Sequence, residues 1–397
     1  MLSLLGRLRN PAAFRWPITS LLFFLVLAGF AHYQLINRNL PYPDPAEVES
    51  LAPFQLSLNE IQIPLATEEE AVRKRLSVEA ALRYLEQGNE VWRDKYRCVG
   101  CHMSGSYMLV RPALTSAVGK PPDLDRKLFL GLAEPLRQDG LDLIFAIGHN
   151  SAQLVYVAAG LAEWDANVTG ELSPETAEML NLMFRIQLEH GAWVMPDCWP
   201  PLQSSPFQLA SLAAIAVGTA PTWLDRVDQP EVARKVELLR EYLRSRAEQH
   251  DYERVWLLWA SSRFPGLLES ARVEQLKEMV LGHQHPDGGW ALRDFARPSE
   301  WGGGVRKSSL EAEEDYASSP SDGHMTGLAV ISLVEAGLSI EDPAIRAAVG
   351  WLVKNQRESG RWWARSLNGK NGLSLITYSA TCYAILALER CRAFPRG

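Results

Sequence analysis

From about residue 68 onward, apolar positions recur with the spacing of α-helices, and strand-like alternation is scarce. The predicted helices are of two kinds. One kind is amphipathic and charged, and it is predicted at 77–96, 174–188, 230–249, 271–283 and 343–355. The other kind is rich in small residues and apolar nearly all round, and it is predicted at 150–162, 206–217, 323–337 and 374–388. Because the two kinds alternate, the charged helices suit an outer layer and the apolar helices an inner layer.

The connections from outer to inner helices also repeat. Three of them share the order Gln, three polar or apolar residues, Gly, one residue, Trp, and they lie at 187–193, 284–290 and 356–362. The glycine permits a left-handed turn where the outer helix ends. The tryptophan can pack back across that turn, with its N–H near helix-end carbonyls. Three such turns at matching places indicate an internal repeat.

These turns resemble the Q-W motifs of squalene-hopene cyclases and related prenyltransferase-like repeat proteins. The resemblance implies an all-α fold, an (α/α)6 toroid in which inner helices form a closed barrel ringed by outer ones. Six pairs require further helices at 126–137 and 251–264. More narrowly, the chain is similar to bacterial membrane-anchored squalene-cyclase-like proteins that carry a C-x-x-C-H site. The resemblance covers residues 68–391, and its closest stretches are Cys98–Leu114, Gly191–Trp193, Leu257–Leu268, Gln284–Trp290, Ser321–Gly327 and Trp362–Asn368.

Residues 98–102 have the form C-x-x-C-H, the attachment sequence of a c-type haem. The thiols of Cys98 and Cys101 can each add to one haem vinyl group, and His102 is then held under the porphyrin as an iron ligand. A redox or half-zinc C-x-x-C is the alternative. However, no second C-x-x-C and no thioredoxin-like βαβ pattern accompany it. The sequence therefore predicts one covalent haem c with His102 as the proximal ligand.

The haem motif follows the first outer helix and precedes an apolar segment from Ser106, where later repeats have a Gln-Gly-Trp turn. We therefore expect the haem at one end of the barrel, facing either an external partner or the central cavity. Arg111 is a candidate partner of a haem propionate, or else a helix-surface arginine.

The sixth iron ligand stays open. Met103 is too near His102 to reach the opposite haem face easily, whereas Met108 lies six residues on and can curl back. His149 and His324 each begin an inner helix, so both are expected at a barrel end. A present sixth ligand would indicate electron transfer, and an absent one catalysis or gas binding. The full set of candidates is Met103, Met108, His149, His190, His285, His324 and Met325.

The N-terminal region predicts a membrane anchor. Residues 17–36 are almost wholly apolar and, at about 1.5 Å per residue, just span a bilayer. Arginines precede them, so residues 1–16 are expected in the cytoplasm and the main domain in the periplasm of a bacterial inner membrane. A cleaved signal peptide is the alternative. The proline-rich residues 37–67 are predicted to be a tether along the body or a partner, or else a solvated linker, before the toroid domain at 68–397.

Charge and acid motifs limit the function. The net charge is −7 without a long basic run, so nothing indicates nucleic acid. Cyclases of this kind protonate an alkene with D-x-D-D, which is absent; the nearest string is 123–126, and the acidic 311–315 is predicted to be a solvated loop. Asp322, His324 and Cys382 do not reproduce a zinc motif, and Asp287 and Asp322 are predicted to cap helices.

The sequence thus favours a membrane-anchored periplasmic monohaem c-type protein, acting in electron transfer or as a haem-bearing accessory subunit of a membrane redox complex. One alternative is a non-catalytic structural or interaction subunit of a respiratory or photosynthetic membrane assembly. Another is an enzyme or binder for an isoprenoid or other apolar ligand in the barrel. Expected partners are membrane lipid, through the N-terminal helix, and a membrane-protein or redox partner. Whether the protein is an enzyme stays open, but cyclase chemistry is disfavoured.

Overall fold

The computed structural model describes residues 54–96, 98–138, 148–195, 199–202, 205–246, 248, 250–304, 306–368 and 375–395. All of them belong to one compact unit, Asp44–Gly397. This part of the chain is mostly helical, which confirms the all-α prediction. No helix within it is long and apolar enough to cross a membrane. The predicted membrane-spanning segment 17–36 lies outside the described residues.

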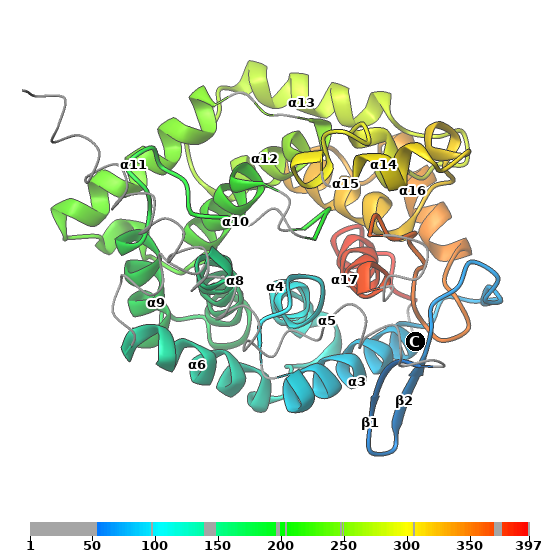
Figure 1. The fold of residues 1–397 in the computed structure, drawn as a ribbon, viewed down its shortest axis with the longest axis horizontal. Helices are drawn as coiled ribbons and strands as arrows, with labels where there is room; N and C mark the ends of the chain where they lie inside the picture. Colours follow the sequence, from blue (N-terminus) through cyan, green and yellow to red (C-terminus); the bar gives the residue numbers. More distant parts are fainter. Residues whose placement is uncertain are drawn as a thin grey trace, which may run out of the picture. The chain divides into compact units, whose positions relative to one another are not determined.

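The longer helices alternate between two layers in chain order (Figure 1). The outer layer consists of α3 (Val78–Tyr96), α6 (Asp123–Gln138), α9 (Pro174–Arg185), α11 (Pro230–Ser245), α13 (Ser270–Gly282) and α16 (Pro343–Lys354). The inner layer consists of α4 (Ser106–Val110), α8 (Gly148–Trp164), α10 (Pro206–Thr219), α12 (Asp251–Arg263), α15 (Gly323–Glu335) and α17 (Leu375–Arg390). The regions 126–137 and 251–264 are therefore helical, as six pairs require.

Shorter elements connect these helices. Two are further α-helices, α5 (Thr115–Val118) and α14 (Lys307–Glu311). Two are wider turns of helix, η1 (Cys101–Gly105) and η3 (Asp165–Thr169). The others are tighter turns: η2 (Pro112–Leu114), η4 (Leu224–Arg226), η5 (Leu292–Phe295), η6 (Trp301–Gly304) and η7 (Tyr316–Ser318).

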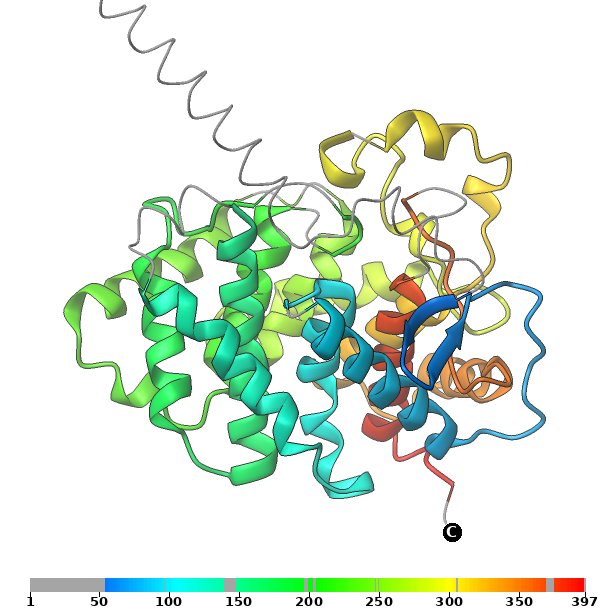
Figure 2. The same ribbon diagram turned by 60° about the horizontal axis from the view of Figure 1, so that its bottom comes forward.

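The inner helices form a closed ring, because each packs against the next and α17 packs against α4 (Figure 1). Contacts at the two ends of the ring show that neighbouring inner helices run in the same direction, and Figure 2 gives a second view of these helices. At their starts, Tyr252 of α12 contacts His324 of α15, with 3.0 Å between Oη and Nε2. At their ends, Arg263 of α12 pairs with Glu335 of α15. The N-termini of neighbouring inner helices therefore meet at one end of the ring, and their C-termini meet at the other.

The three predicted Gln-Gly-Trp turns have the same hydrogen bonds. Each glutamine donates from Nε2 to the carbonyl of the turn glycine at 2.9 Å, in the pairs Gln187–Gly191, Gln284–Gly288 and Gln356–Gly360. Each tryptophan indole donates to a carbonyl of the preceding outer helix, in the pairs Trp193–Met183, Trp290–Val280 and Trp362–Leu352. The glycines have φ values of +94°, +92° and +96°, which glycine adopts without strain. The internal repeat is thereby confirmed.

The last of these turns helps to close the ring. Gly360 packs so tightly on α3 that an added Cβ would lie 2.3 Å from the Ala80 carbonyl oxygen. In addition, Gln356 donates to the Ser77 carbonyl at 2.9 Å and accepts from the Ser77 N–H at 2.7 Å. The final repeat is thus joined to the first outer helix by backbone-specific contacts.

Part of the predicted tether lies along the body. Strands β1 (Phe54–Leu58) and β2 (Ile61–Pro64) form an antiparallel hairpin that contacts α3. The Tyr84 hydroxyl donates to Gln55 Oε1 at 3.1 Å, and the Arg361 guanidinium donates to the Pro64 carbonyl at 2.8 Å. This arrangement favours the first of the two alternatives for the tether, at least from Phe54 onward.

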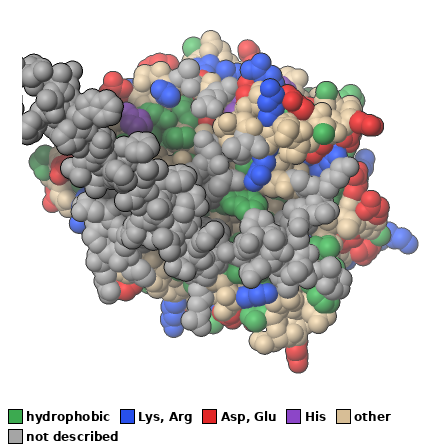
Figure 3. Space-filling view, viewed as in Figure 1, with side chains coloured by type: hydrophobic (Ala, Val, Ile, Leu, Met, Phe, Trp, Pro, Cys, Tyr) green, Lys and Arg blue, Asp and Glu red, His purple; other side chains and the backbone are tan. Residues whose placement is uncertain are grey.

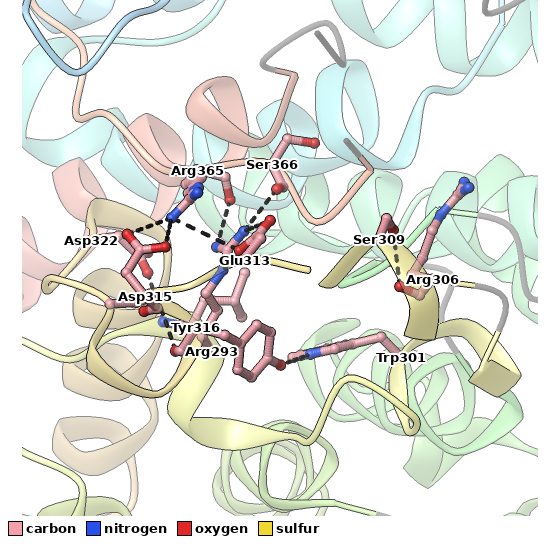
Figure 4. Close-up of polar contacts among 12 residues, drawn as sticks. Arg293, Trp301, Arg306, Ser309, Glu313, Asp315, Tyr316, Asp322, Arg365 and Ser366 are labelled. Atoms are coloured by element: carbon pink, nitrogen blue, oxygen red, sulfur yellow. Dashed lines mark hydrogen bonds and ion pairs between the residues drawn. The ribbon is translucent and has the colours of Figure 1, made fainter. Parts of the chain in front are cut away.

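Acidic and basic side chains are interspersed on the face shown in Figure 3. The acidic stretch 311–315 is mostly exposed, as expected of the solvated loop that was predicted, with Glu313 as the exception. Glu313 is 9% exposed at its side chain and accepts from Arg293 Nε at 2.7 Å. Asp315 pairs with Arg365 at 2.7 Å, and Figure 4 shows both pairs among the connecting loops. The stretch therefore joins two loops through ion pairs, although Glu311 and Glu314 are exposed.

Candidate functional site

The C-x-x-C-H motif lies on the connection from α3 to α4, as predicted. A tryptophan of the preceding outer helix supports it: Trp92 Nε1 donates to the Cys98 carbonyl at 3.0 Å. A Cβ on Gly100 would lie 2.6 Å from the Trp92 ring, so only glycine fits there without a shift. Ser104 Oγ also donates to the Cys98 carbonyl, at 3.2 Å. In this repeat the indole comes from Trp92 within the outer helix. In the later repeats it comes from a tryptophan that follows the turn.

The three chemically active side chains of the motif are all buried. Cys98, Cys101 and His102 are 7%, 5% and 6% exposed. His102 Nδ1 lies 3.0 Å from Cys101 Sγ, whereas His102 Nε2 has no hydrogen-bond partner. Burial lowers the pKa of His102 to about 4, so the imidazole is neutral at pH 7, the form that binds metals. Burial raises the pKa of the Cys98 thiol to about 11, so it stays protonated.

An unpaired, buried imidazole nitrogen fits the predicted iron ligand. A buried polar group without a partner costs about 1–3 kcal/mol, so a group that completes it is expected. Cys101 directly precedes His102, and Cys98 lies four residues before it. Both cysteines are buried, as His102 is. The residues present therefore fit a covalently bound haem with His102 as the proximal ligand. Cys101 lies near Tyr156 and Tyr383 of the inner helices, whereas Cys98 lies beside Trp92 of outer helix α3, and the whole motif is buried.

Other unpaired polar atoms lie on the inner helices. They belong to Tyr156 of α8, Gln208 of α10, Trp256 of α12 and Tyr383 of α17, all fully buried. Cys101 is among the groups that raise the pKa values of Tyr156 and Tyr383, after burial as the main cause. These side chains and His102 therefore surround one interior region, which we call the central polar cluster. Unmade hydrogen bonds of this kind are completed by water or by a bound molecule.

Sequence reasoning did not single out the tyrosines and Gln208 of this cluster. A signal was present for Gln208, since it stands in an inner helix that is otherwise apolar or small. Tyrosines in such helices are ordinarily core residues, so their unpaired hydroxyls became apparent only in the folded chain.

Several candidates for the sixth ligand lie elsewhere. Met108 packs beside Gly160 of α8, where Phe129 of outer helix α6 also packs, so it lies between the two layers. His285 is held by Asp294 at 2.6 Å and Ser321 at 3.2 Å. His190 is exposed. The structure describes only the backbone of His149, in the first turn of α8, and both Met103 and Met325 are buried.

His324 lies in the interior. It is fully buried in the first turn of α15 and its ring centroid is 5.1 Å from that of Tyr383. Its Nε2 lies 3.0 Å from the Tyr252 hydroxyl, and its Nδ1 lies 3.1 Å from Ser379 Oγ. Burial, and then the nearby His102, lower the pKa of His324. Among the candidates whose side chains are described, His324 is the histidine that shares the interior with His102.

Arg111 is buried and bound to protein groups. It donates to Glu86 Oε1 at 3.1 Å, to the Gly119 carbonyl at 2.8 Å and to the Lys120 carbonyl at 3.4 Å. It is therefore no helix-surface arginine. Its pairing with a haem propionate stays a prediction, which these contacts do not favour because the guanidinium already fixes the loop after α5.

The acids serve structural contacts. Asp322 accepts from the Met325 and Leu292 N–H groups at 2.9 and 2.6 Å, which confirms it as the cap of α15. Asp287 accepts from the Gly289 N–H and the Trp351 indole, so it stabilises a turn instead of a helix start. Asp125, in the string nearest to D-x-D-D, accepts from Tyr107, Asn89 and Arg93. Across the described ranges, no group of three or more His, Cys, Asp or Glu is placed to hold a metal ion.

The α-helical fold and the repeated turns are similar to those of squalene-cyclase-like repeat proteins. Comparison with known proteins supports this class: 107 residues are 31% identical to a squalene–hopene cyclase from Zymomonas mobilis. The match covers 26% of this chain and only 15% of the cyclase, so the similarity is to a part of that enzyme. No family model matches the chain.

Proposed function

We propose that this chain is a membrane-anchored, periplasmic monohaem c-type protein built on an (α/α)6 toroid. Its role is electron transfer, or service as a haem-bearing accessory subunit of a membrane redox complex. The anchor is residues 17–36, and the haem is held by Cys98, Cys101 and His102. The activity of the cyclase that it partly resembles is not proposed for it, because the chain lacks D-x-D-D.

The observation that carries this proposal is the burial of two thiols beside an imidazole nitrogen without a partner. Each thiol can add S–H across one vinyl group, forming one C–S bond and placing the hydrogen on the other vinyl carbon. This addition releases no by-product and needs no oxidant. The bound haem would supply one-electron redox chemistry, while the chain holds the ligand nitrogen in place and keeps bulk water away from it.

The role of apolar-ligand binder is less well supported. Aromatic rings occupy the interior between α12 and α17, with centroid separations of 5.4 Å for Trp256–Trp259, 6.3 Å for Trp256–Tyr383 and 6.4 Å for Trp259–Tyr383. Such packing leaves little room for an isoprenoid chain on that side. The unpaired atoms of Tyr156 on α8 and Gln208 on α10 are polar, which suits a ligand with hydrogen-bonding groups better than a hydrocarbon.

The decisive test is covalent haem in the full-length protein, expressed in a bacterium with c-type haem maturation. A pyridine haemochrome spectrum should show one haem c per chain. Cys98→Ser and Cys101→Ser should each lose at least one thioether bond, whereas Cys391→Ser, outside the motif, should keep full haem content. A folded wild-type chain without covalent haem would falsify the proposal. Membrane fractionation and protease access to the helical domain test the anchor separately.

A further inference from the structure

His324 is held in one tautomer by its neighbours. Ser379 Oγ donates its single proton to the Ile376 carbonyl at 3.0 Å. It can therefore only accept from His324, so His324 Nδ1 carries the ring proton. His324 Nε2 then bears the lone pair, and the Tyr252 hydroxyl donates to it. This is the arrangement of metal-binding histidines, in which Nδ1–H is fixed by a second partner and Nε2 faces the metal.

His102 presents the same nitrogen to the same region. Its Nε2 has no partner and its Nδ1 faces Cys101 Sγ. Helix α17 connects the two histidines, because it packs on η1, which contains His102, and also carries Ser379 and Tyr383 against His324. Two imidazole nitrogens are thus buried in one region, on two segments of the ring, η1 and α15, that both pack on α17.

We infer that His324 Nε2 would be a second protein ligand of the haem iron, in addition to His102, with Ser379 as its positioning residue. This inference rests on the proposed function. Ligation displaces the Tyr252 hydroxyl from Nε2 and leaves it as a polar neighbour. Two histidine ligands give a six-coordinate low-spin iron, which favours electron transfer over gas binding or catalysis.

The test uses the full-length, haem-loaded protein in detergent. Wild type should show low-spin absorption and EPR spectra and no carbon monoxide binding in the ferrous state. His324→Ala should lose the low-spin signal and bind carbon monoxide, and added imidazole should restore the low-spin spectrum. His324→Met should stay low-spin with a raised midpoint potential and a methionine–iron charge-transfer band. His190→Ala, a change at an exposed histidine, should match wild type.

Ser379→Ala tests the positioning role. It removes the acceptor of the Nδ1–H bond, so the ligand becomes less electron-donating and the midpoint potential should rise while the spectrum stays low-spin. A role confined to packing would leave the potential unchanged.

The outcomes separate the two ideas. Without covalent haem in folded wild type, the proposed function fails. With haem present, an unchanged low-spin spectrum in His324→Ala overturns this inference alone. If His324→Ala does not accumulate, His324→Met decides instead: a spectrum identical to that of wild type overturns the assignment, and a methionine band supports it.

Discussion

The interior of the inner-helix ring and its C-terminal end differ in whether their buried polar groups have partners. In the interior of the ring, the central polar cluster leaves atoms of His102, Tyr156, Gln208, Trp256 and Tyr383 without a partner at hydrogen-bond distance. At the C-terminal ends, the charged groups of Glu163, Arg263, Glu335 and Arg390 pair with one another. Folding alone does not require unpaired buried groups, since each costs stability. The difference is consistent with a site in the interior of the ring, where the proposed function requires one.

The C-terminal end is closed by a group that we call the terminal ion cluster: Glu163, Arg263, Glu335 and Arg390, from α8, α12, α15 and α17. Glu335 accepts from Arg263 at 2.5 and 2.6 Å and from Arg390 at 3.0 Å. Glu163 lies 3.8 Å from Arg263. The Trp259 indole also donates to Glu335, at 2.9 Å. These contacts connect four inner helices and leave Glu335 only 9% exposed.

The largest expected effect is at the terminal ion cluster. Glu335→Gln removes the buried charge that Arg263 and Arg390 share and leaves them only Glu163 at 3.8 Å and Glu389 at 2.6 Å, so the free energy of unfolding should fall by about 3 kcal/mol. Chemical denaturation measures this loss. The matched control is Glu79→Gln, whose partner Arg83 is exposed; it should cost less than about 1 kcal/mol. Haem content should stay the same in both variants. If Glu335→Gln were as mild as the control, the C-terminal end would not be the stabilising one.

The pH dependence of stability should differ between His250, the cap of α12, and Glu335 of the terminal ion cluster. Burial lowers the pKa of His250, the cap of α12, to about 4, while Asp251 and Glu300 oppose this shift and Arg254 adds to it. Between that value and the unfolded value of about 6.5, the unfolded state binds more protons. Stability therefore rises with pH across this window, by about 3 kcal/mol from this one group.

His250→Asn keeps a side chain that can cap the helix but removes the titration. The difference in unfolding free energy between wild type and variant should thus grow between pH 4 and 6.5. For Glu335 burial raises the pKa, but Arg263 and Arg390 outweigh it and the net pKa is lowered. Its contribution is lost only as pH falls below about 4.5. If the unfolding free energies of wild type and His250→Asn changed equally with pH, His250 would not be the source of this pH dependence.

The smallest expected effect compares two buried tyrosines of α17. The Tyr378 hydroxyl donates to the Leu85 carbonyl at 2.5 Å, whereas the Tyr383 hydroxyl lies near Ser106 but has no partner at hydrogen-bond distance. Tyr378→Phe should therefore cost about 1 kcal/mol, and Tyr383→Phe should be neutral or slightly stabilising. Thermal and denaturant unfolding of both variants give the answer. A larger cost for Tyr383→Phe would mean that its hydroxyl is satisfied in the folded protein.

Local sequence predicted much of the architecture. The helical periodicity located both kinds of helix to within a few residues, because burial of one face imposes that periodicity. The repeated turns were predictable because each glutamine, such as Gln187, donates to the carbonyl of the turn glycine in the same seven-residue motif. The β-hairpin was not predicted, since its short strands lie in a proline-rich region and gain their stability from packing on α3.

For the site, the sequence by itself determined one group of residues: the two thiols and the histidine of the C-x-x-C-H motif. Their spacing along the chain keeps them together on the first outer-to-inner connection. Only the tertiary structure decided what lies around them. Tyr156, Gln208, His324 and Tyr383 come from four different helices, and ring closure brings them to one interior. Whether a buried polar atom has a partner depends on groups hundreds of residues away, such as Tyr378 and Leu85. No local pattern in the chain encodes that pairing.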